Sequence, residues 1–111
     1  MNISYRRFHR HPVFAKAVIR SRNMGDTDEL DSQVNNISQG GMGVYTELPL
    51  MESTPVTVEI SFTSYDNLVI RHILEGSVVS LTKQDDQYFM NIAFDKTISH
   101  EDFMKMFQLE Y

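Results

Sequence analysis

The chain has 111 residues, enough for one domain with a single hydrophobic core, and its 41% hydrophobic content is ordinary for a globular protein. Its lack of cysteine excludes disulfides and thiolate metal sites, and no apolar run reaches the roughly 18 residues of a membrane span. We therefore expect a cytoplasmic protein without membrane insertion. The net charge is -5, yet residues 1–25 hold six basic residues and no acidic one. This local basic charge suits a small anionic ligand, whereas nucleic acid is an unlikely partner because its binders usually show a broad basic face.

In chain order, residues 1–11 come first, and they have no apolar periodicity, so we expect a mobile segment. From residue 12 onward apolar side chains alternate with polar ones, which predicts half-buried strands. The rows fall at 13–19, 30–34, 42–48, 56–62, 68–82 and 88–94. In the fifth row the alternation shifts near Gly76, which predicts a bulge or bend at that glycine.

Six short strands separated by turn residues predict an all-β fold with one C-terminal helix, built as a six-stranded antiparallel β-barrel over residues 12–95. Ser99, followed three residues later by Asp102, is typical of a helix start, which predicts a helix over residues 99–110. Its apolar residues Phe103, Met106 and Phe107 recur at helical spacing, so we expect the helix to dock on the barrel. Residues 1–111 are interpreted as a single domain.

Two motifs combine residue types that suit an anionic, base-containing ligand. Arg6, Arg7 and Arg10 place three guanidinium groups in one short segment, and arginine meets phosphates and guanine edges with a bidentate fork. Residues 36–41, Asn-Ile-Ser-Gln-Gly-Gly, form a polar turn between two predicted strands. Taken separately, each motif is more often structural, as surface salt bridges or as a β-turn.

Taken together, Arg-x-x-x-Arg and a later Asn-x-Ser-x-x-Gly resemble the signature of the PilZ family, which are bacterial receptors for cyclic di-GMP. The resemblance covers essentially the whole chain. It implies a PilZ-like split barrel and a receptor or adaptor that changes conformation on binding and signals to an unidentified protein partner. It implies no enzymatic activity, no metal and no cofactor besides the ligand. The residues that it implies for cyclic di-GMP are Arg6, Arg7, Arg10, Asn36, Ser38, Gly40 and Gly41.

Within this resemblance we expect Ser38 to donate to a phosphate oxygen, and Gly41 to adopt a positive φ. Asn36 stands where many members have Asp, so it offers one acceptor oxygen fewer to guanine N–H groups. Tyr5 precedes the first motif arginine, at a place where an added cation would favour a stacked pair of ligands. An uncharged residue there favours a single ligand, although Arg7 supplies a third cation.

Two alternatives stay open. One is a PilZ-type interaction module that does not bind nucleotide, although such members usually lack the arginines that this chain keeps. The other is a small β-barrel for single-stranded nucleic acid, which would need several exposed aromatic residues on one sheet face and a less acidic body. We expect no metal site, because His9 and His11 lack a third ligand at metal spacing.

Overall fold

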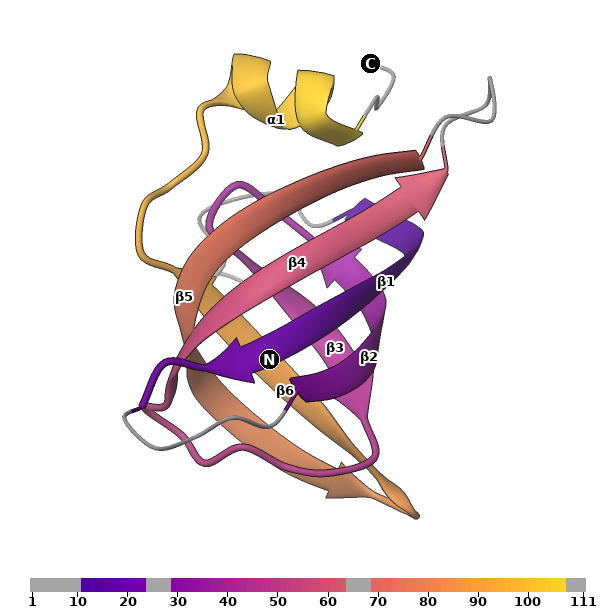
Figure 1. Ribbon diagram of the computed structural model, residues 1–111, viewed down its shortest axis with the longest axis vertical. Coiled ribbons are helices and arrows are strands. Elements are labelled where there is room, and N and C mark those ends of the chain that lie inside the picture. Colours follow the sequence, from indigo (N-terminus) through magenta and orange to yellow (C-terminus); the bar gives the residue numbers. More distant parts are fainter. Residues whose placement is uncertain (1–10, 24–28, 64–68, 108–111) are drawn as a thin grey trace, which may run out of the picture.

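The computed structural model describes residues 11–23, 29–63 and 69–107 of the chain. The strands close into one antiparallel barrel in the order β1-β2-β3-β6-β5-β4 (Figure 1). The elements are β1 (His11–Ser21), β2 (Glu29–Ile37), β3 (Gly41–Thr46), β4 (Pro55–Thr63), β5 (Val69–Gln84), β6 (Gln87–Phe94) and α1 (His100–Phe107). The predicted fold, a six-stranded antiparallel barrel with one C-terminal helix, is confirmed.

Two parts of the sequence-based organisation fall outside this description. Residues 1–10, which include all three motif arginines, and residues 108–111 lie outside the described residues. The mobile segment and the helix end at residue 110 therefore stay predictions. The described helix, α1, is neither long enough nor apolar enough to cross a membrane.

The barrel interior is filled by the inward-facing row of each strand. The sequence predicts an apolar row over residues 42–48, which would include Leu48. The strand β3 instead ends at Thr46, and Leu48 lies beyond it with 63% of its surface exposed. Thr46 is buried, and its hydroxyl donates to the Leu48 carbonyl at 2.7 Å. A threonine can occupy the core here because the following turn satisfies its hydroxyl.

The predicted irregularity in β5 is present but lies farther along the strand. The register of β5 against β6 shifts between Val78 and Ser80, and the additional residue, Val79, is 53% exposed. Gly76 is paired in register, and a Cβ at this position would lie 2.3 Å from the Ala93 carbonyl oxygen. Glycine is therefore required at residue 76 by the close approach of two backbones rather than by a bulge.

The helix α1 lies across one end of the barrel (Figure 1). Its start is as predicted, since the Ser99 hydroxyl accepts a hydrogen bond from the Asp102 N–H at 3.2 Å. Phe103 and Met104 are 2% and 7% exposed and belong to the same hydrophobic cluster as the strand residues. This burial confirms that the helix docks on the barrel, which an eight-residue helix needs for its stability. Of the three predicted docking residues only Phe103 is tested, because the side chains of Met106 and Phe107 lie outside the described part of the chain.

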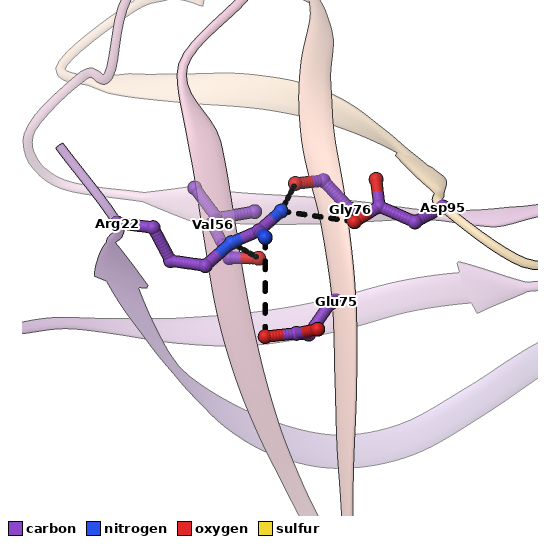
Figure 2. Close-up of polar contacts among 5 residues, drawn as sticks. All are labelled: Arg22, Val56, Glu75, Gly76 and Asp95. Carbon is purple, nitrogen blue, oxygen red and sulfur yellow. Dashed lines mark hydrogen bonds and ion pairs between the residues drawn. The ribbon is translucent and has the colours of Figure 1, made fainter.

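Arg22 joins four segments just after the end of β1 (Figure 2). Its Nε donates to the Val56 carbonyl at 3.2 Å, and its Nη2 donates to the Gly76 carbonyl at 2.9 Å and to the Asp95 carboxylate at 3.0 Å. A longer ion pair, 3.9 Å, reaches Glu75. Arg22 therefore ties β4 and β5 to the segment that leaves β6 toward α1.

We expect Arg22→Met to lower the free energy of unfolding by about 1–3 kcal/mol, because it removes several hydrogen bonds of a partly buried charged donor. Arg20→Met is the matched control. Arg20 makes ion pairs with Glu29 and Glu59 on the outer face of the barrel, and exposed pairs of this kind contribute at most about 1 kcal/mol. Urea denaturation measures both variants, and equal losses would contradict the bridging role of Arg22.

Candidate functional site

The pairing of β1 with β2 brings the two sequence motifs together. At the start of β1, His11 is the Cα partner of Ile37, and Pro12 is the partner of Asn36. Arg10 is covalently joined to His11, and consecutive Cα atoms are about 3.8 Å apart. The arginine segment therefore joins the barrel beside Asn36 and the turn that follows it, although Arg6, Arg7 and Arg10 themselves lie outside the described residues.

Both strands are irregular at this point. The register of β1 shifts between Pro12 and Ala15, and that of β2 against β3 shifts between Val34 and Asn36. Val34 and Ile37 are both buried although they are three residues apart, whereas a regular strand would bury every second residue. The bulge in β2 therefore moves Asn36 out of the inward row and onto the outer surface, opposite Gly43.

Ser38 stabilises the turn between β2 and β3. Its hydroxyl oxygen accepts hydrogen bonds from the N–H groups of Gly40 and Gly41, both at 3.2 Å, and lies 3.3 Å from the Gly41 carbonyl, to which it donates. The Ser38 N–H also donates to that carbonyl at 2.8 Å, and the residue is 3% exposed. In this structure the hydroxyl is occupied by the turn, so a donation from Ser38 to a phosphate stays a prediction.

Gly41 differs from its expected conformation. Its φ lies outside the left-handed region, so the predicted positive φ is wrong. A Cβ at Gly41 would lie 2.4 Å from the Ile92 carbonyl oxygen, on the neighbouring strand β6. The residue is glycine because the backbones of β3 and β6 approach closely where the turn ends.

An aromatic pair that the sequence analysis did not identify lies next to Asn36. The rings of Tyr45 in β3 and Phe89 in β6 are 4.9 Å apart between centroids and tilted by 54°. A Cβ at Gly43 would lie 2.6 Å from Cζ of Phe89 and 3.1 Å from Nδ2 of Asn36, so Gly43 leaves room for the ring and the amide. Alternation can place each ring on the outer face, because Tyr45 follows inward Val44 and Phe89 precedes inward Met90, but the contact itself depends on the register of β3 against β6.

The turn is also fastened to the segment between β6 and α1. The Gln39 carbonyl accepts from the Ile98 N–H at 2.9 Å, and the Gln39 Nε2 donates to the Ile98 carbonyl at 2.9 Å. The Gly40 carbonyl accepts from the Phe94 N–H, also at 2.9 Å. Residues 94–98 therefore connect the motif turn directly to the start of the helix.

The candidate site has four parts. They are the start of β1, where the arginine segment joins the barrel, the outward-facing amide of Asn36, the turn with Gly40 and Gly41, and the aromatic pair Tyr45 and Phe89. Asn36, Ser38, Gly40 and Gly41 come together at one end of the β2–β3 hairpin. Such a surface offers amide, backbone and aromatic groups to a base-containing ligand. Among the described residues, no three His, Asp or Glu side chains cluster in a way that could hold a metal ion.

Comparisons with known proteins agree with this fold. The model of the PilZ domain family matches residues 4–109, whereas comparison with curated protein sequences finds no match. Among solved structures, the chain is similar to the inhibitor of motility MotI/DgrA from Bacillus subtilis, with 17% identity and a TM-score of 0.71 over 93% of this chain and 48% of that chain.

Two further structures are similar, and both were solved with c-di-GMP. For the PilZ domain of YcgR from Escherichia coli the identity is 15% and the TM-score 0.62, over 91% of this chain and 85% of that chain. For MrkH of K. pneumonia the values are 16% and 0.58, over 93% and 49%. The chain thus spans about half of MotI and of MrkH, and at these identities the likeness shows the fold.

We expect Ser38→Ala to lower the free energy of unfolding by about 1–2 kcal/mol, because two turn N–H groups and a carbonyl lose their shared partner. Ser61→Ala is the control, since Ser61 is half-buried in β4 and makes no side-chain hydrogen bond within the described part of the chain. Chemical denaturation compares the two variants. If both were as stable as the parent, the Ser38 hydroxyl would have no structural role.

Proposed function

The chain belongs to the PilZ domain family, and on that premise we propose that it is a non-enzymatic receptor for cyclic di-GMP. The observation that carries the proposal is the pairing of His11 with Ile37 and of Pro12 with Asn36, which joins the arginine segment to the barrel beside the second motif. The presence of c-di-GMP in the similar structures of YcgR and MrkH supports the choice of ligand.

In this proposal the arginines supply the charge. Cyclic di-GMP carries two phosphates and two guanines, and an arginine can pair with guanine O6 and N7 or stack on the base. Arg6 and Arg10 bind the ligand together, with Arg7 as a third cation, and residues 1–11 close over it as a clamp. Because Tyr5, the residue before the first motif arginine, adds no charge to the clamp, the site holds a single ligand.

The second motif supplies the specificity. The Asn36 amide oxygen accepts from a guanine N–H group, which its position on the outer face of β2 permits. Ser38 keeps Gly40 and Gly41 in a turn without side chains, so that the ligand can approach the backbone. The rings of Tyr45 and Phe89 lie beside Asn36 and offer an apolar surface to a base.

The receptor acts as an adaptor for a protein effector. A ligand held at the β2–β3 turn contacts a segment that is hydrogen-bonded through Gln39 to Ile98, and so to the start of α1. Ligand binding therefore changes two surfaces, the clamp and the helix end, which a partner can recognise. This role places the protein in the cytoplasm, where the clamp (1–11), the barrel (12–95) and the helix (99–110) act as one domain.

We expect cyclic di-GMP to bind with micromolar or tighter affinity, on the order of -8 kcal/mol. Isothermal titration calorimetry measures this, with GTP, cyclic GMP and a single-stranded oligonucleotide as control ligands. Heat from the oligonucleotide alone would favour the nucleic-acid alternative. If cyclic di-GMP gave no heat at concentrations well above the micromolar range, the receptor proposal would be wrong. The remaining alternative would be a PilZ-type interaction module that does not bind nucleotide.

Replacement of the motif arginines tests the clamp. Arg6→Ala and Arg10→Ala should each raise the Kd roughly tenfold or more, since each removes charge-assisted hydrogen bonds worth roughly 1.5–3 kcal/mol. Arg7→Ala should have a smaller effect. Arg20→Ala is the control, because this arginine is paired with Glu29 and Glu59 and should not change the Kd. If Arg7→Ala raised the Kd strongly and Arg6→Ala left it unchanged, the arginine motif would be assigned to the wrong residues.

We expect Asn36→Asp to hold or improve affinity, because a carboxylate offers an additional acceptor to guanine N–H groups. Asn35→Asp adds the same charge at the neighbouring exposed residue and serves as the control for long-range repulsion. A clear loss of affinity in Asn36→Asp alone would place this side chain next to a phosphate instead of a base.

A further inference from the structure

A row of outward-facing residues crosses four strands next to the β2–β3 turn. Asn36 in β2 is paired with Gly43 in β3, which is paired in turn with Asn91 in β6. On the other side of Asn91, its partner is Ser80 in β5. Directly paired residues lie on the same face of a sheet, so the whole row shares the outward orientation of Asn36. Two amide side chains therefore lie on the outer face, one on each side of a glycine.

A bulge at each end of the row turns its end residue outward. The bulge in β2 does this for Asn36, and the bulge at Val79 in β5 does it for Ser80. Val78 is buried, so regular alternation would also bury residue 80, whereas Ser80 is only half-buried and lies opposite outward Asn91. Bulges are frequent next to active sites, where they redirect a side chain. Two bulges that act on one row indicate that the row does more than pack.

The hydrogen bond between Asn91 and Ser80 fixes the orientation of the second amide. Nδ2 of Asn91 donates to Oγ of Ser80 at 2.8 Å. The amide nitrogen is therefore turned toward β5, and the amide oxygen, on the other branch of the same planar group, points away from Ser80. An amide oxygen has two lone pairs, so Asn91 offers an acceptor to a molecule that lies on the outer face of the barrel.

The surface between the two amides is low and partly apolar. The amides lie two strand spacings apart, about 10 Å. Gly43, between them, has no side chain, and the ring of Phe89 lies close to it, because a Cβ at Gly43 would be 2.6 Å from Cζ of Phe89. The next outward pair, on the side of the turn, consists of the small residues Gly41 and Ala93. A planar base can therefore approach the backbone here with an amide at its edge.

In the proposed receptor, on which the assignment depends, one guanine of cyclic di-GMP lies at Asn36. The pairing of Pro12 with Asn36 puts the arginine segment on the β1 side of this residue, so the neighbouring barrel surface on the other side is formed by β3 and β6. The two guanines are joined in one small ring, so the second lies near the first. We propose that Asn91, oriented by Ser80, binds the second guanine and thereby selects a ligand with two guanines.

The orientation of the Asn91 amide decides which base it accepts. Guanine carries adjacent donors, N1–H and the N2 amino group, that can both reach one acceptor oxygen. Adenine has an unprotonated N1 beside its amino group, and asparagine pairs with adenine through both its nitrogen and its oxygen. Because Nδ2 of Asn91 is directed at Ser80, only the oxygen is turned toward the ligand. The site is therefore suited to guanine and unsuited to adenine.

Isothermal titration calorimetry of the full chain with cyclic di-GMP and with the hybrid cyclic GMP–AMP tests the role of Asn91. The parent should bind cyclic di-GMP at least about tenfold more tightly, because adenine replaces one guanine in the hybrid. Asn91→Ala should weaken cyclic di-GMP about tenfold and leave the hybrid unchanged, whereas Asn91→Asp retains an acceptor and should keep the preference. Gln87→Ala, which removes an exposed amide near the start of β6, is the control and should change neither Kd.

Ser80→Ala tests the positioning role of the hydroxyl separately. Without its acceptor, the Asn91 amide can turn and present both its nitrogen and its oxygen to adenine. The hybrid should therefore bind this variant at least about threefold more tightly than it binds the parent. A substitution that only destabilised the barrel would weaken both ligands and could not produce this gain. An unchanged preference for cyclic di-GMP would contradict the positioning role of Ser80.

The outcomes distinguish the role of Asn91 from the receptor function itself. If cyclic di-GMP did not bind the parent, both proposals would be wrong. If the parent bound cyclic di-GMP but did not prefer it to the hybrid, the second guanine would not be recognised, and the role of Asn91 would be overturned while the receptor function remained. Equal losses of affinity for both ligands in Asn91→Ala would overturn that role in the same way.

Discussion

The two-sided pairing of β1, with β2 along one edge and with β4 along the other, closes the barrel and fixes where the N-terminal segment enters it. Because His11 is paired with Ile37, the arginines join the fold beside the second motif. The register shifts in β1, after Pro12, and in β2, before Asn36, then determine which side chains lie on the outer surface beside that segment. Without the bulge before Asn36, period-two alternation would turn its amide into the core, where an unpaired polar group is costly.

The β2–β3 turn is a rigid part of the fold. Ser38 holds it from within, and Gln39 and Gly40 bind it to the segment that follows β6. Arg22 holds the same segment through Asp95. A ligand that displaces the turn must therefore displace this segment or break its hydrogen bonds, which gives the proposed receptor a physical route from the motif to α1.

Local patterns predicted much of this architecture. Alternation and turn residues predicted six strands in a barrel, and Ser99 predicted the helix start, because these signals depend on neighbours in sequence. Leu48 was wrongly expected in the inward row of β3, because alternation does not show that Thr46 can be buried once its hydroxyl has a hydrogen-bond acceptor. Gly76 was wrongly expected at a bulge, because alternation does not show where the backbones of two strands approach closely. The glycine at residue 41 was recognised, but sequence could not tell whether it served a positive φ or a close approach.

The parts of the site that depend on strand register could not be predicted. Asn36 was identified by its motif, yet its outward orientation results from a bulge that only the pairing with β3 defines. The contact between Tyr45 and Phe89 likewise joins strands distant in sequence, and Gly43 makes room for it. The motif therefore identified polar and glycine positions, whereas the aromatic surface beside them required the structure.

In the proposed receptor the ligand binds where the arginine segment meets the β2–β3 turn, and backbone amide NMR shifts during a titration with cyclic di-GMP test this position. Amides of residues 36–41 should shift together with those of Phe94 and Ile98, with one common dissociation constant. Saturable shifts that leave residues 36–41 unchanged would contradict it.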